Sequence, residues 1–404
     1  MITSLRNLLL VLTSVLFVAD LVQSVFYINE ADRREGDDHM PHWVYYTCFC
    51  AFFGAMVFAL LAPTLPLMWV AVELTTLVSA PLIAYHRSRG ALEAMWKYLL
   101  ICSIGIGLAL FGTMLVMHAL ELAEHGALEG SRMWFKIGFV FVLAGYGTKT
   151  GLAPFHTWLP DAHSEAPAPV SALLSGALLN CSFFAIVRFR TIMPDEVAGF
   201  CDTAMITLGL LSLAVAAVFM VRQTDYKRLL AYSSIEHMGL IVTLFALWSA
   251  KPTEILAAAL GAHIVAHSLT KTLLFQTAGN LLLAFGTRAI AVVQGLGVSM
   301  KGHAALWVTG IIFICGMPPS VLFLSELGLV LNAPFELAAL VLALLFIVFA
   351  AMTKVALAMT MGRPTPPLPG RLPKRLLIVP ALLFLVLVVG SLLACCDMAC
   401  LIGK

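Results

Sequence analysis

The sequence predicts an all-α polytopic membrane protein with about 12 transmembrane helices, two of them broken by proline. Of the 404 residues, 61% are hydrophobic and only 11% are charged, whereas water-soluble domains carry about 25% charged residues. The mean hydropathy is +0.97. Apolar runs of about 20 residues, enough for a helix to cross a bilayer, recur along the whole chain. The net charge of only +2 argues against a nucleic-acid partner.

The first apolar run has no small-residue cleavage site, so we expect a retained membrane helix rather than a signal peptide. The most polar loops are expected at residues 29–42 and 120–132, and residues 364–369 (PTPPLP) predict a stiff connector before the last helix. The expected spans, in chain order, cover residues 5–28, 43–62, 66–85, 96–118, 134–152, 168–189, 202–221, 228–249, 254–284, 304–331, 336–361 and 376–396.

Two five-helix units of opposite orientation are predicted, because an odd number of helices inverts one unit relative to the other. In each unit the second helix carries a mid-span carboxylate, and the fourth is charged and broken by proline. Interrupted helices at corresponding positions of two halves point to a transport site. These positions are Glu73 and Lys149 with Pro154 in the first unit, and Glu236 and Glu326 with Pro318 and Pro319 in the second. The predicted divisions are residues 1–42 (N-terminal helix and polar loop), 43–190 (first repeat), 200–362 (second repeat) and 363–404 (C-terminal helix).

Loop charges predict the orientation. Lysine and arginine are about twice as frequent on one set of loops as on the other, and the richer set includes residues 222–228. Cytoplasmic loops carry the excess of positive charge, so we expect this set inside and both chain termini outside.

Several charges remain inside the expected spans, where each costs roughly 3 kcal/mol unless it is paired or hydrated. They are Lys149, Lys271, Lys354, Glu73, Glu236 and Glu326, with Asp20 in the first span as a further candidate. His263, His267 and Lys271 stand at i, i+4 and i+8, which is one face of a helix. Backbone that leaves the helix at membrane depth is tolerated only where it is buried in protein or lines a cavity. Titratable groups beside broken helices therefore indicate an ion path.

The chain offers no redox chemistry of its own. Its nine cysteines show no CxxC pair and no Cys/His ligand spacing, so we expect no metal site. There is no dinucleotide-binding fingerprint and no P-loop, so no cofactor is expected. The energy for transport would have to come from partner subunits.

Two segments carry a resemblance to a known family. Residues 145–167 (GYGTKTGLAPFHTWLPDAHSEAP) closely resemble the broken-helix motif of antiporter-like proton-pumping subunits, and residues 228–239 (RLLAYSSIEHMG) are a second match. That superfamily includes membrane subunits of respiratory complex I, Mrp-type antiporters and energy-converting [NiFe] hydrogenases. The Glu236-His237 pair and residues 175–181 (SGALLNC) look most like hydrogenase-4 component F. The resemblance covers roughly residues 43–360.

The resemblance implies a role for each matching position. Glu73 and Lys149 resemble the family's carboxylate–lysine pair, Lys271 its central lysine and Glu326 its terminal acid, while Glu236 and His237 belong to the second motif. His263 and His267 match histidines on the central hydrated axis. Asn180 stands where complex I subunits usually have a bridging lysine, a change also typical of the hydrogenase branch. Compared with the family, the chain is expected to lack two N-terminal helices and a long lateral C-terminal helix.

The function expected from this resemblance is proton translocation along a buried Glu–Lys–His–Lys–Glu relay in a multisubunit, redox-driven complex. The expected partners are the lipid bilayer, other membrane subunits and a peripheral redox arm with NiFe-hydrogenase-like and iron–sulfur subunits. The expected location is the bacterial or archaeal cytoplasmic (inner) membrane. Three alternatives stay open: an Mrp-type cation/proton antiporter subunit, the membrane subunit of an inorganic-carbon uptake complex, and an inert scaffold.

Overall fold

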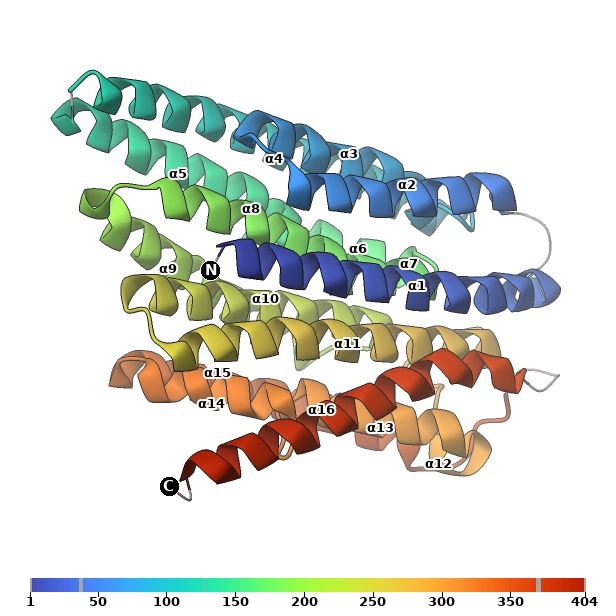
Figure 1. Cartoon of the computed structure of the whole chain (residues 1–404). Helices are drawn as coiled ribbons and strands as arrows, with labels where there is room; N and C mark the ends of the chain where they lie inside the picture. Colours follow the sequence, from blue (N-terminus) through green and yellow to red (C-terminus); the bar gives the residue numbers. More distant parts are fainter. Residues whose placement is uncertain (1, 36–38, 127, 368–371, 403–404) are drawn as a thin grey trace.

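The computed structural model describes residues 2–35, 39–126, 128–367 and 372–402. Within these ranges the chain is helical and forms an elongated bundle whose helices run in roughly one direction (Figure 1). Nine of the described helices are long and apolar enough to cross a membrane. Three further expected spans correspond to α5, α11 and the α13–α14 pair, which are helical but more polar or shorter. The protein is therefore an all-helical membrane protein.

The first half of the chain contains five long helices and then a series of shorter ones. They are α1 (Ile2–Glu35), α2 (His42–Leu61), α3 (Leu65–Ile83), α4 (Arg89–Glu124), α5 (Leu128–Thr150), α6 (Trp158–Glu165), α7 (Ala168–Leu173), the π-helical turn η1 (Leu174–Leu178) and α8 (Leu179–Ile192). The expected span at 168–189 is thus not one regular α-helix. A π segment widens its middle, next to Asn180, and single π turns of this kind are frequent at functional sites.

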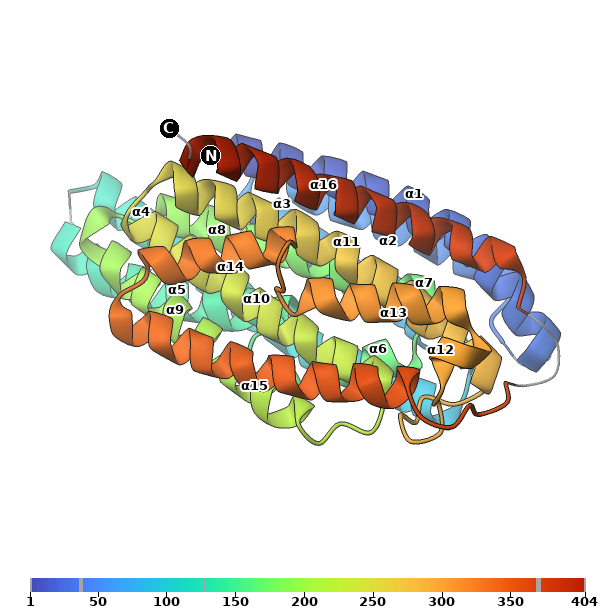
Figure 2. The same ribbon diagram turned by 90° about the horizontal axis from the view of Figure 1, so that it is seen from below.

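The second half contains the other interrupted helix. Its elements are α9 (Asp195–Met220), α10 (Tyr226–Ala250), α11 (Glu254–Phe285), α12 (Leu296–Ser299), α13 (Lys301–Ile314), α14 (Val321–Asn332), α15 (Phe335–Thr360), the 3-10 turn η2 (Lys374–Leu377) and α16 (Ile378–Ile402). In its most apolar 18-residue stretch the segment α7–η1–α8 is entirely buried and α10 is 94% buried, whereas α15 is 28% buried. The first two therefore form the centre of the bundle and α15 lies at its edge (Figure 2).

Both long polar loops were predicted with the wrong extent. The helix α1 continues to Glu35 because Glu30 pairs with Arg34 one turn later, at 2.8 Å. The segment expected as a loop at 120–132 is mostly helical, since α4 reaches Glu124 and α5 starts at Leu128. Polar residues at these helix ends extend the helices beyond the apolar runs.

Glycines allow α4 and α5 to approach closely. A methyl group on Gly112 would lie 2.7 Å from the carbonyl oxygen of Gly138, and one on Gly145 would collide with the backbone nitrogen of Ala109. Small residues at such contacts let two helix backbones meet, which drives helix association inside membranes. This contact places the C-terminal end of α5, with Lys149, against the side of α4.

Candidate functional site

Lys149 lies fully buried in the last turn of α5. Its ammonium group donates to Thr76 Oγ1 at 2.9 Å and to the hydroxyl of Tyr98 at 2.5 Å, and it lies 4.5 Å from the centre of the Tyr98 ring. The Tyr98 hydroxyl in turn contacts Ser79 Oγ at 2.7 Å. The cation is thus solvated by hydroxyl groups and an aromatic face, which stabilise a charge less than a carboxylate in contact would.

Glu73 does not touch Lys149. Its carboxylate accepts from Thr76 Oγ1 at 3.3 Å and from Ser103 Oγ at 3.0 Å, and the side chain is half-buried on the outer side of α3. The expected carboxylate–lysine pair is therefore joined through one hydroxyl group, that of Thr76. A hydroxyl both donates and accepts, so it can pass a proton between its two neighbours.

The break after Lys149 is built by specific contacts. Gly151 has a φ of +83°, which favours glycine, and its backbone turns the chain out of α5. The indole of Trp158 donates to the carbonyl of Thr148 at 2.8 Å, and the backbone nitrogen of Ala153 donates to Ser212 Oγ at 2.9 Å. These contacts satisfy backbone groups that the broken helix frees, as membrane depth requires. Pro154 lies in this non-helical stretch between α5 and α6.

A second polar cluster lies between α10, α11 and α14. Lys271 is fully buried on α11 and donates to the carbonyl of Leu230 at 2.7 Å and to Ser233 Oγ. Again no carboxylate contacts the ammonium group among the described residues. Glu236 is buried on α10. Its Oε2 has no hydrogen-bond partner among the described residues and lies 4.0 Å from His237 Nε2. Both ring nitrogens of His267 also lack a partner in the described part of the chain.

His237 and His263 form a hydrogen-bonded chain. His237 Nε2 lies 2.9 Å from the carbonyl of Ile314, so it carries a hydrogen. His237 Nδ1 lies 3.0 Å from His263 Nε2, and His263 Nδ1 lies 2.8 Å from Ser325 Oγ.

This chain can hold one extra proton without breaking a contact. When both rings are neutral, His263 donates to His237 and Ser325 donates to His263. With an added proton, His237 Nδ1 donates to His263 Nε2 and His263 Nδ1 donates to Ser325 Oγ. The Ser325 hydroxyl then turns to the carbonyl of Leu322, 2.8 Å away. The geometry suits proton exchange through a rotating hydroxyl group.

Glu326 lies at the second broken helix, where α13 ends at Ile314 and α14 begins at Val321, with Pro318 and Pro319 in the break. Its side chain lies against Gly316, where an added methyl group would collide with Oε2. Glu326 also lines a cavity of about 260 Å³ between α14 and α15. The carboxyl group is therefore placed between the histidine chain and an opening towards the edge of the bundle.

Asn180 follows the π segment and links it to α11. Its amide donates to the carbonyl of Gly176 and to Ser268 Oγ, both at 2.8 Å, while Oδ1 has no partner among the described residues. The side chain therefore lies against α11 at Ser268, beside the face of the second cluster, and no hydrogen bond among the described residues joins it to Lys149.

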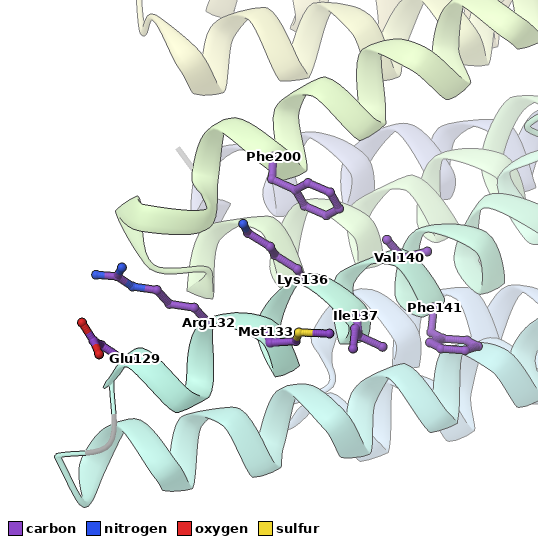
Figure 3. Close-up of a pocket in the computed structure, with 8 residues that line it drawn as sticks. All are labelled: Glu129, Arg132, Met133, Lys136, Ile137, Val140, Phe141 and Phe200. Carbon is purple, nitrogen blue, oxygen red and sulfur yellow. The ribbon is translucent and has the colours of Figure 1, made fainter.

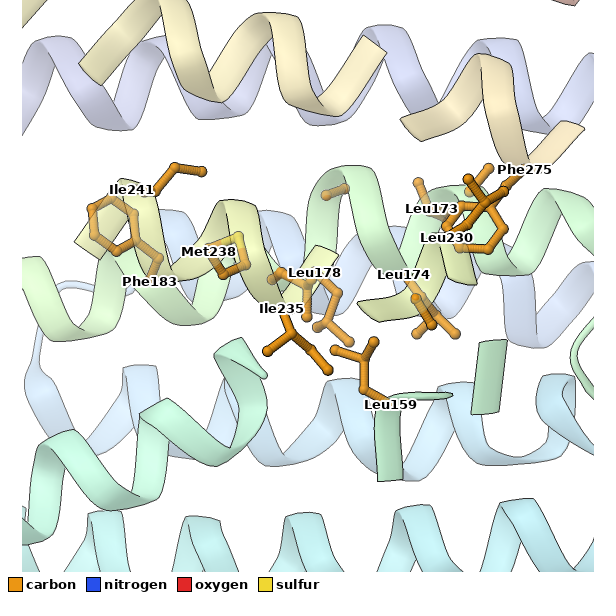
Figure 4. Packing of buried hydrophobic residues seen from close by; sticks show 14 of the residues in the cluster. Leu159, Leu173, Leu174, Leu178, Phe183, Leu230, Ile235, Met238, Ile241 and Phe275 are labelled. Carbon is orange, nitrogen blue, oxygen red and sulfur yellow. The ribbon is translucent and has the colours of Figure 1, made fainter. Parts of the chain in front are cut away.

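Mostly apolar side chains fill the core between α6, α7, η1 and α10. Figure 4 shows Leu159 of α6 and Leu178 of η1 near Ile235 of α10, and Leu173 of α7 beside Leu230 and Phe275. No hydrogen bond between described side chains joins the Lys149 cluster to the Lys271–histidine cluster. Of the sequence-predicted site residues, the structure thus brings together one group around Lys149 and another around His237. A mostly apolar layer separates them, crossed by one hydrogen bond of 2.8 Å between Ser175 Oγ of η1 and Ser234 Oγ of α10.

A layer of surface charges lies at the outer end of α6. Asp161 pairs with Lys97 at 3.1 Å and with Arg228, and Arg288 pairs with Glu165 at 2.7 Å. A polar cavity of about 130 Å³ lies among these side chains. The charges anchor α6, the segment after the first break, to α4, α10 and the segment after α11.

The cavity of about 450 Å³ shown in Figure 3 lies elsewhere, at the start of α5 beside α9. Lys136 lies 5.6 Å from the centre of the Phe200 ring there, above Ile137, Val140 and Phe141. None of the buried site residues lines it, so it is not part of the charged site.

Two groups of described residues have the geometry to hold a metal ion. One is His237, His263 and Glu326, whose ligand atoms lie within 4.8 Å of one another inside the bundle. The other is Asp32, His39 and His42 at the surface between α1 and α2. Next to this second group, burial and then the Asp32 carboxylate raise the pKa of the Tyr85 hydroxyl far above its ordinary value.

Sequence reasoning missed the neutral partners of the charged groups. These are Thr76, Ser79, Tyr98, Ser103, Ser233 and Ser325. A further missed residue is His163, which is buried and stacked on Phe275 with the ring centres 4.8 Å apart. Hydroxyl residues are common in membrane helices, so their type alone gives no signal. His163 lies in the quoted motif and could have been singled out by its position.

A comparison with family models gives a match over residues 62–357 to the transmembrane region of NADH:quinone oxidoreductase and Mrp antiporter subunits. The chain belongs to this family. Both broken helices and all the buried lysines and histidines described above fall within the matched range. The resemblance expected from residues 145–167 and 228–239 is therefore confirmed.

Individual family members are similar over large parts of the chain. A hydrogenase-4 component F homolog of Methylacidiphilum infernorum is 40% identical over 310 residues, which is 72% of this chain and 63% of the relative. An Na(+)/H(+) antiporter subunit of Alkalihalophilus pseudofirmus is 31% identical over 326 residues, covering 76% of this chain and 39% of the relative. The chain thus spans less than two thirds of the length of these relatives. The solved Mrp complex from Dietzia sp. DQ12-45-1b contains a chain with the same fold, with a TM-score of 0.83, 18% identity and coverage of 96% of this chain and 80% of that one.

Proposed function

We propose that this chain is a proton-translocating membrane subunit of a multisubunit, redox-driven complex of the energy-converting hydrogenase or complex I type. The observation that carries the proposal is the environment of Lys149. A buried ammonium next to a broken helix, held by hydroxyl groups and one hydroxyl away from a carboxylate, is suited to gaining and losing a proton. The family membership and the hydrogenase-4 relative support the same reading.

The first step takes place at Glu73, Thr76 and Lys149. Burial disfavours the charged form of a lysine, and a nearby carboxylate favours it. A change in the charge or position of Glu73, relayed through Thr76, therefore changes how strongly Lys149 holds its proton. Because Glu73 is half-buried at the edge of the bundle, a neighbouring subunit could set its charge.

The second half continues through Lys271, His267, His263 and His237 to Glu326. The reversible hydrogen bonds of the His237–His263–Ser325 chain let a proton enter at one end and leave at the other. The cavity beside Glu326 supplies an exit towards α15. We assign Glu326 the role of the gate at this end.

The apolar layer between the clusters acts as a gate in this mechanism. Hydrophobic constrictions in channels close by excluding water and open when water enters. Proton transfer from Lys149 to the second cluster would require a transient water file past the leucines of η1, stabilised by the free Oδ1 of Asn180. The layer would thereby prevent protons from leaking between the two clusters when no transfer takes place.

Two charges that are not fully buried support partner subunits on two faces. The half-buried Glu73 belongs to α3 and the exposed Lys354 to α15, and these two helices lie at opposite edges of the bundle (Figure 1). A charge facing lipid at this depth is costly, so each is expected to be covered by another membrane subunit. A peripheral redox arm as the energy source, and the bacterial or archaeal cytoplasmic membrane as the location, belong to the same proposal.

The test uses the purified complex in lipid vesicles, driven by its electron donor, with a pH-sensitive dye inside. Lys149→Ala and Glu73→Gln should each reduce coupled proton uptake by about a hundredfold or more, since each removes a proton-transfer group, while the composition of the complex stays intact. Unaltered proton uptake in both variants would overturn the proposal.

A second candidate, an Mrp-type cation/proton antiporter subunit, is favoured by the relative named as part of an Na(+)/H(+) antiporter. The same vesicles decide between the two. Sodium flux that requires Lys149 and proceeds without electron donor would favour the antiporter.

A further inference from the structure

A second polar stripe runs along α11, beside the face that carries His263, His267 and Lys271. It consists of Ser268, Thr272, Gln276 and Asn280, which are spaced by four residues and are all fully buried. Residues at this spacing share one face of a helix. The face with the histidines contacts α10 and α14, whereas this stripe faces α1, η1, α8 and η2.

The contacts of the stripe connect the centre of the bundle with its end. Ser268 accepts from Asn180 at 2.8 Å, and a methyl group on Gly176 of η1 would lie 3.0 Å from Thr272 Oγ1. Gln276 donates to Asp20 Oδ1 of α1 at 2.7 Å.

The stripe ends at the surface turn before α16. Asn280 donates to the carbonyl of Leu376 at 2.9 Å, and Gln23 of α1 donates to the same carbonyl at 3.2 Å. Leu376 belongs to η2, which precedes the last membrane helix and carries Lys374 and Arg375. The polar groups therefore extend from Asn180 to one end of the bundle.

Asp20 is the one acid among the described residues on this path, and it is completely buried. Its Oδ2 has no hydrogen-bond partner within the described ranges, and neither carboxyl oxygen has an ion-pair partner there. The oxygens Gln23 Oε1, Gln276 Oε1 and Thr272 Oγ1 are also buried and unpartnered. Among them, Gln276 contacts Asp20 directly, and no cation pairs with the carboxyl group within the described ranges.

None of the charged groups on the surrounding elements is hydrogen-bonded or ion-paired to Asp20 within the described ranges, although Arg375 Nε is itself buried without a hydrogen-bond partner. Lys271 of α11 binds α10, Tyr45 of α2 accepts from Ser24, and Arg375 of η2 lies 5.7 Å from the Phe26 ring. On α8, Arg190 pairs with Asp202, Arg188 donates to the carbonyl of Ala62, and Cys181 is a free, buried thiol. The segments α7 and η1 contribute no titratable side chain. A buried carboxyl group without a cation is most stable when it carries a proton, which it can donate to a free amide oxygen.

We propose that Asp20 is a second proton-binding site, and that the stripe from η2 to Asn180 is a branch that delivers protons to the second cluster of the relay. The binding of a proton by Asp20 stands on its own geometry, whereas delivery to the relay rests on the proposed function. Asp20 would accept a proton from the η2 end and release it to water held by the free oxygens of Gln276 and Thr272, which leads towards Ser268 and Asn180. No covalent bond other than those to hydrogen changes.

Infrared difference spectroscopy on the intact complex tests proton binding. The wild type should show the carbonyl stretch of a protonated carboxylic acid at neutral pH, with a shift in deuterated water. Asp20→Asn should remove this band, and Gln276→Met should shift it, because the carboxyl loses its amide partner. The matched control is Glu30→Gln on the same helix, since Glu30 is ion-paired with Arg34 and should not contribute to the band.

Either of two outcomes would overturn the inference. The band could survive in Asp20→Asn and stay unshifted in Gln276→Met, which would show that Asp20 holds no proton. Sodium ions at constant pH could abolish the band, which would make Asp20 a sodium site.

Transport tests the branch. Coupled proton uptake should fall about tenfold or more in Asp20→Asn, as expected for loss of a positioned proton-transfer group. Wild-type uptake in Asp20→Asn, with loss of uptake in Lys149→Ala, would refute the branch alone. Wild-type uptake in both Lys149→Ala and Glu73→Gln would instead refute the proposed function.

Discussion

The ammonium group of Lys149 is held by two hydroxyl oxygens, one of which also binds the carboxylate of Glu73. An ammonium that touched the carboxylate directly would be fixed in its charged state by a strong charge-assisted bond. The intervening hydroxyl weakens this coupling and gives the proton a route between the two groups. At the residue scale, Thr76 is therefore expected to be needed for proton transfer as much as Glu73 and Lys149 are.

Substitution of Thr76 provides a matched test of this role. Thr76→Val keeps the shape and removes the hydroxyl, so coupled proton uptake should fall by about tenfold or more. Thr75→Val is the control, because Thr75 is equally buried but donates only to the carbonyl of Val72 in its own helix. Equal rates in the two variants would remove Thr76 from the proton path.

Charged residues could be predicted from the sequence because a charge in an apolar run is conspicuous. Lys149, Lys271 and the histidines at i and i+4 stood out on that ground. Their hydroxyl partners could not be predicted, because Thr76, Tyr98 and Ser325 come from other helices and their contacts depend on how the helices pack. The distance between Glu73 and Lys149 depended on the same packing.

At the scale of elements, each interrupted helix frees backbone groups where a titratable side chain lies. The sequence located both breaks through their prolines, but the π segment of residues 174–178 has no proline and was missed. Glycine and proline mark a break locally, whereas a π turn is imposed by the neighbouring helices. The polar loop ends were also missed, because pairs such as Glu30–Arg34 extend a helix beyond its apolar run.

The close contact of α4 and α5 gives an element-scale prediction. Gly112→Ala should destabilise the protein by about 1–3 kcal/mol, because the methyl group would collide with backbone atoms of α5. Gly107→Ala on the same helix is the control, since no atom lies within 4 Å of the added methyl group. Thermal unfolding of the purified complex measures both, and a similar transition temperature for the two variants would contradict the close packing.

At the scale of the whole molecule, the first and last described residues lie at the same end of the bundle (Figure 1). The loop charges predict that this end faces outward and that the α9–α10 loop faces the cytoplasm. The orientation and the two inverted repeats remain predictions.

Impermeant thiol labelling of intact cells tests the orientation, in a background without reactive cysteines. Thr224→Cys, in the α9–α10 loop, should be protected, whereas Glu196→Cys, at the start of α9, should react. The reverse pattern would invert the topology and refute the argument from loop charges.

The central claim is that two polar clusters, separated by an apolar layer, form one proton path through the molecule. Asn180 bonds η1 and α11 and keeps one free oxygen, so its substitution tests the connection most directly. Proton uptake by the complex in vesicles should fall in Asn180→Leu, because an apolar side chain prevents water from bridging the layer. Asn180→Lys should retain uptake, since it supplies a titratable group at the same place. Wild-type uptake in Asn180→Leu would show that protons do not pass between the clusters at this point, and the proposed path would be wrong.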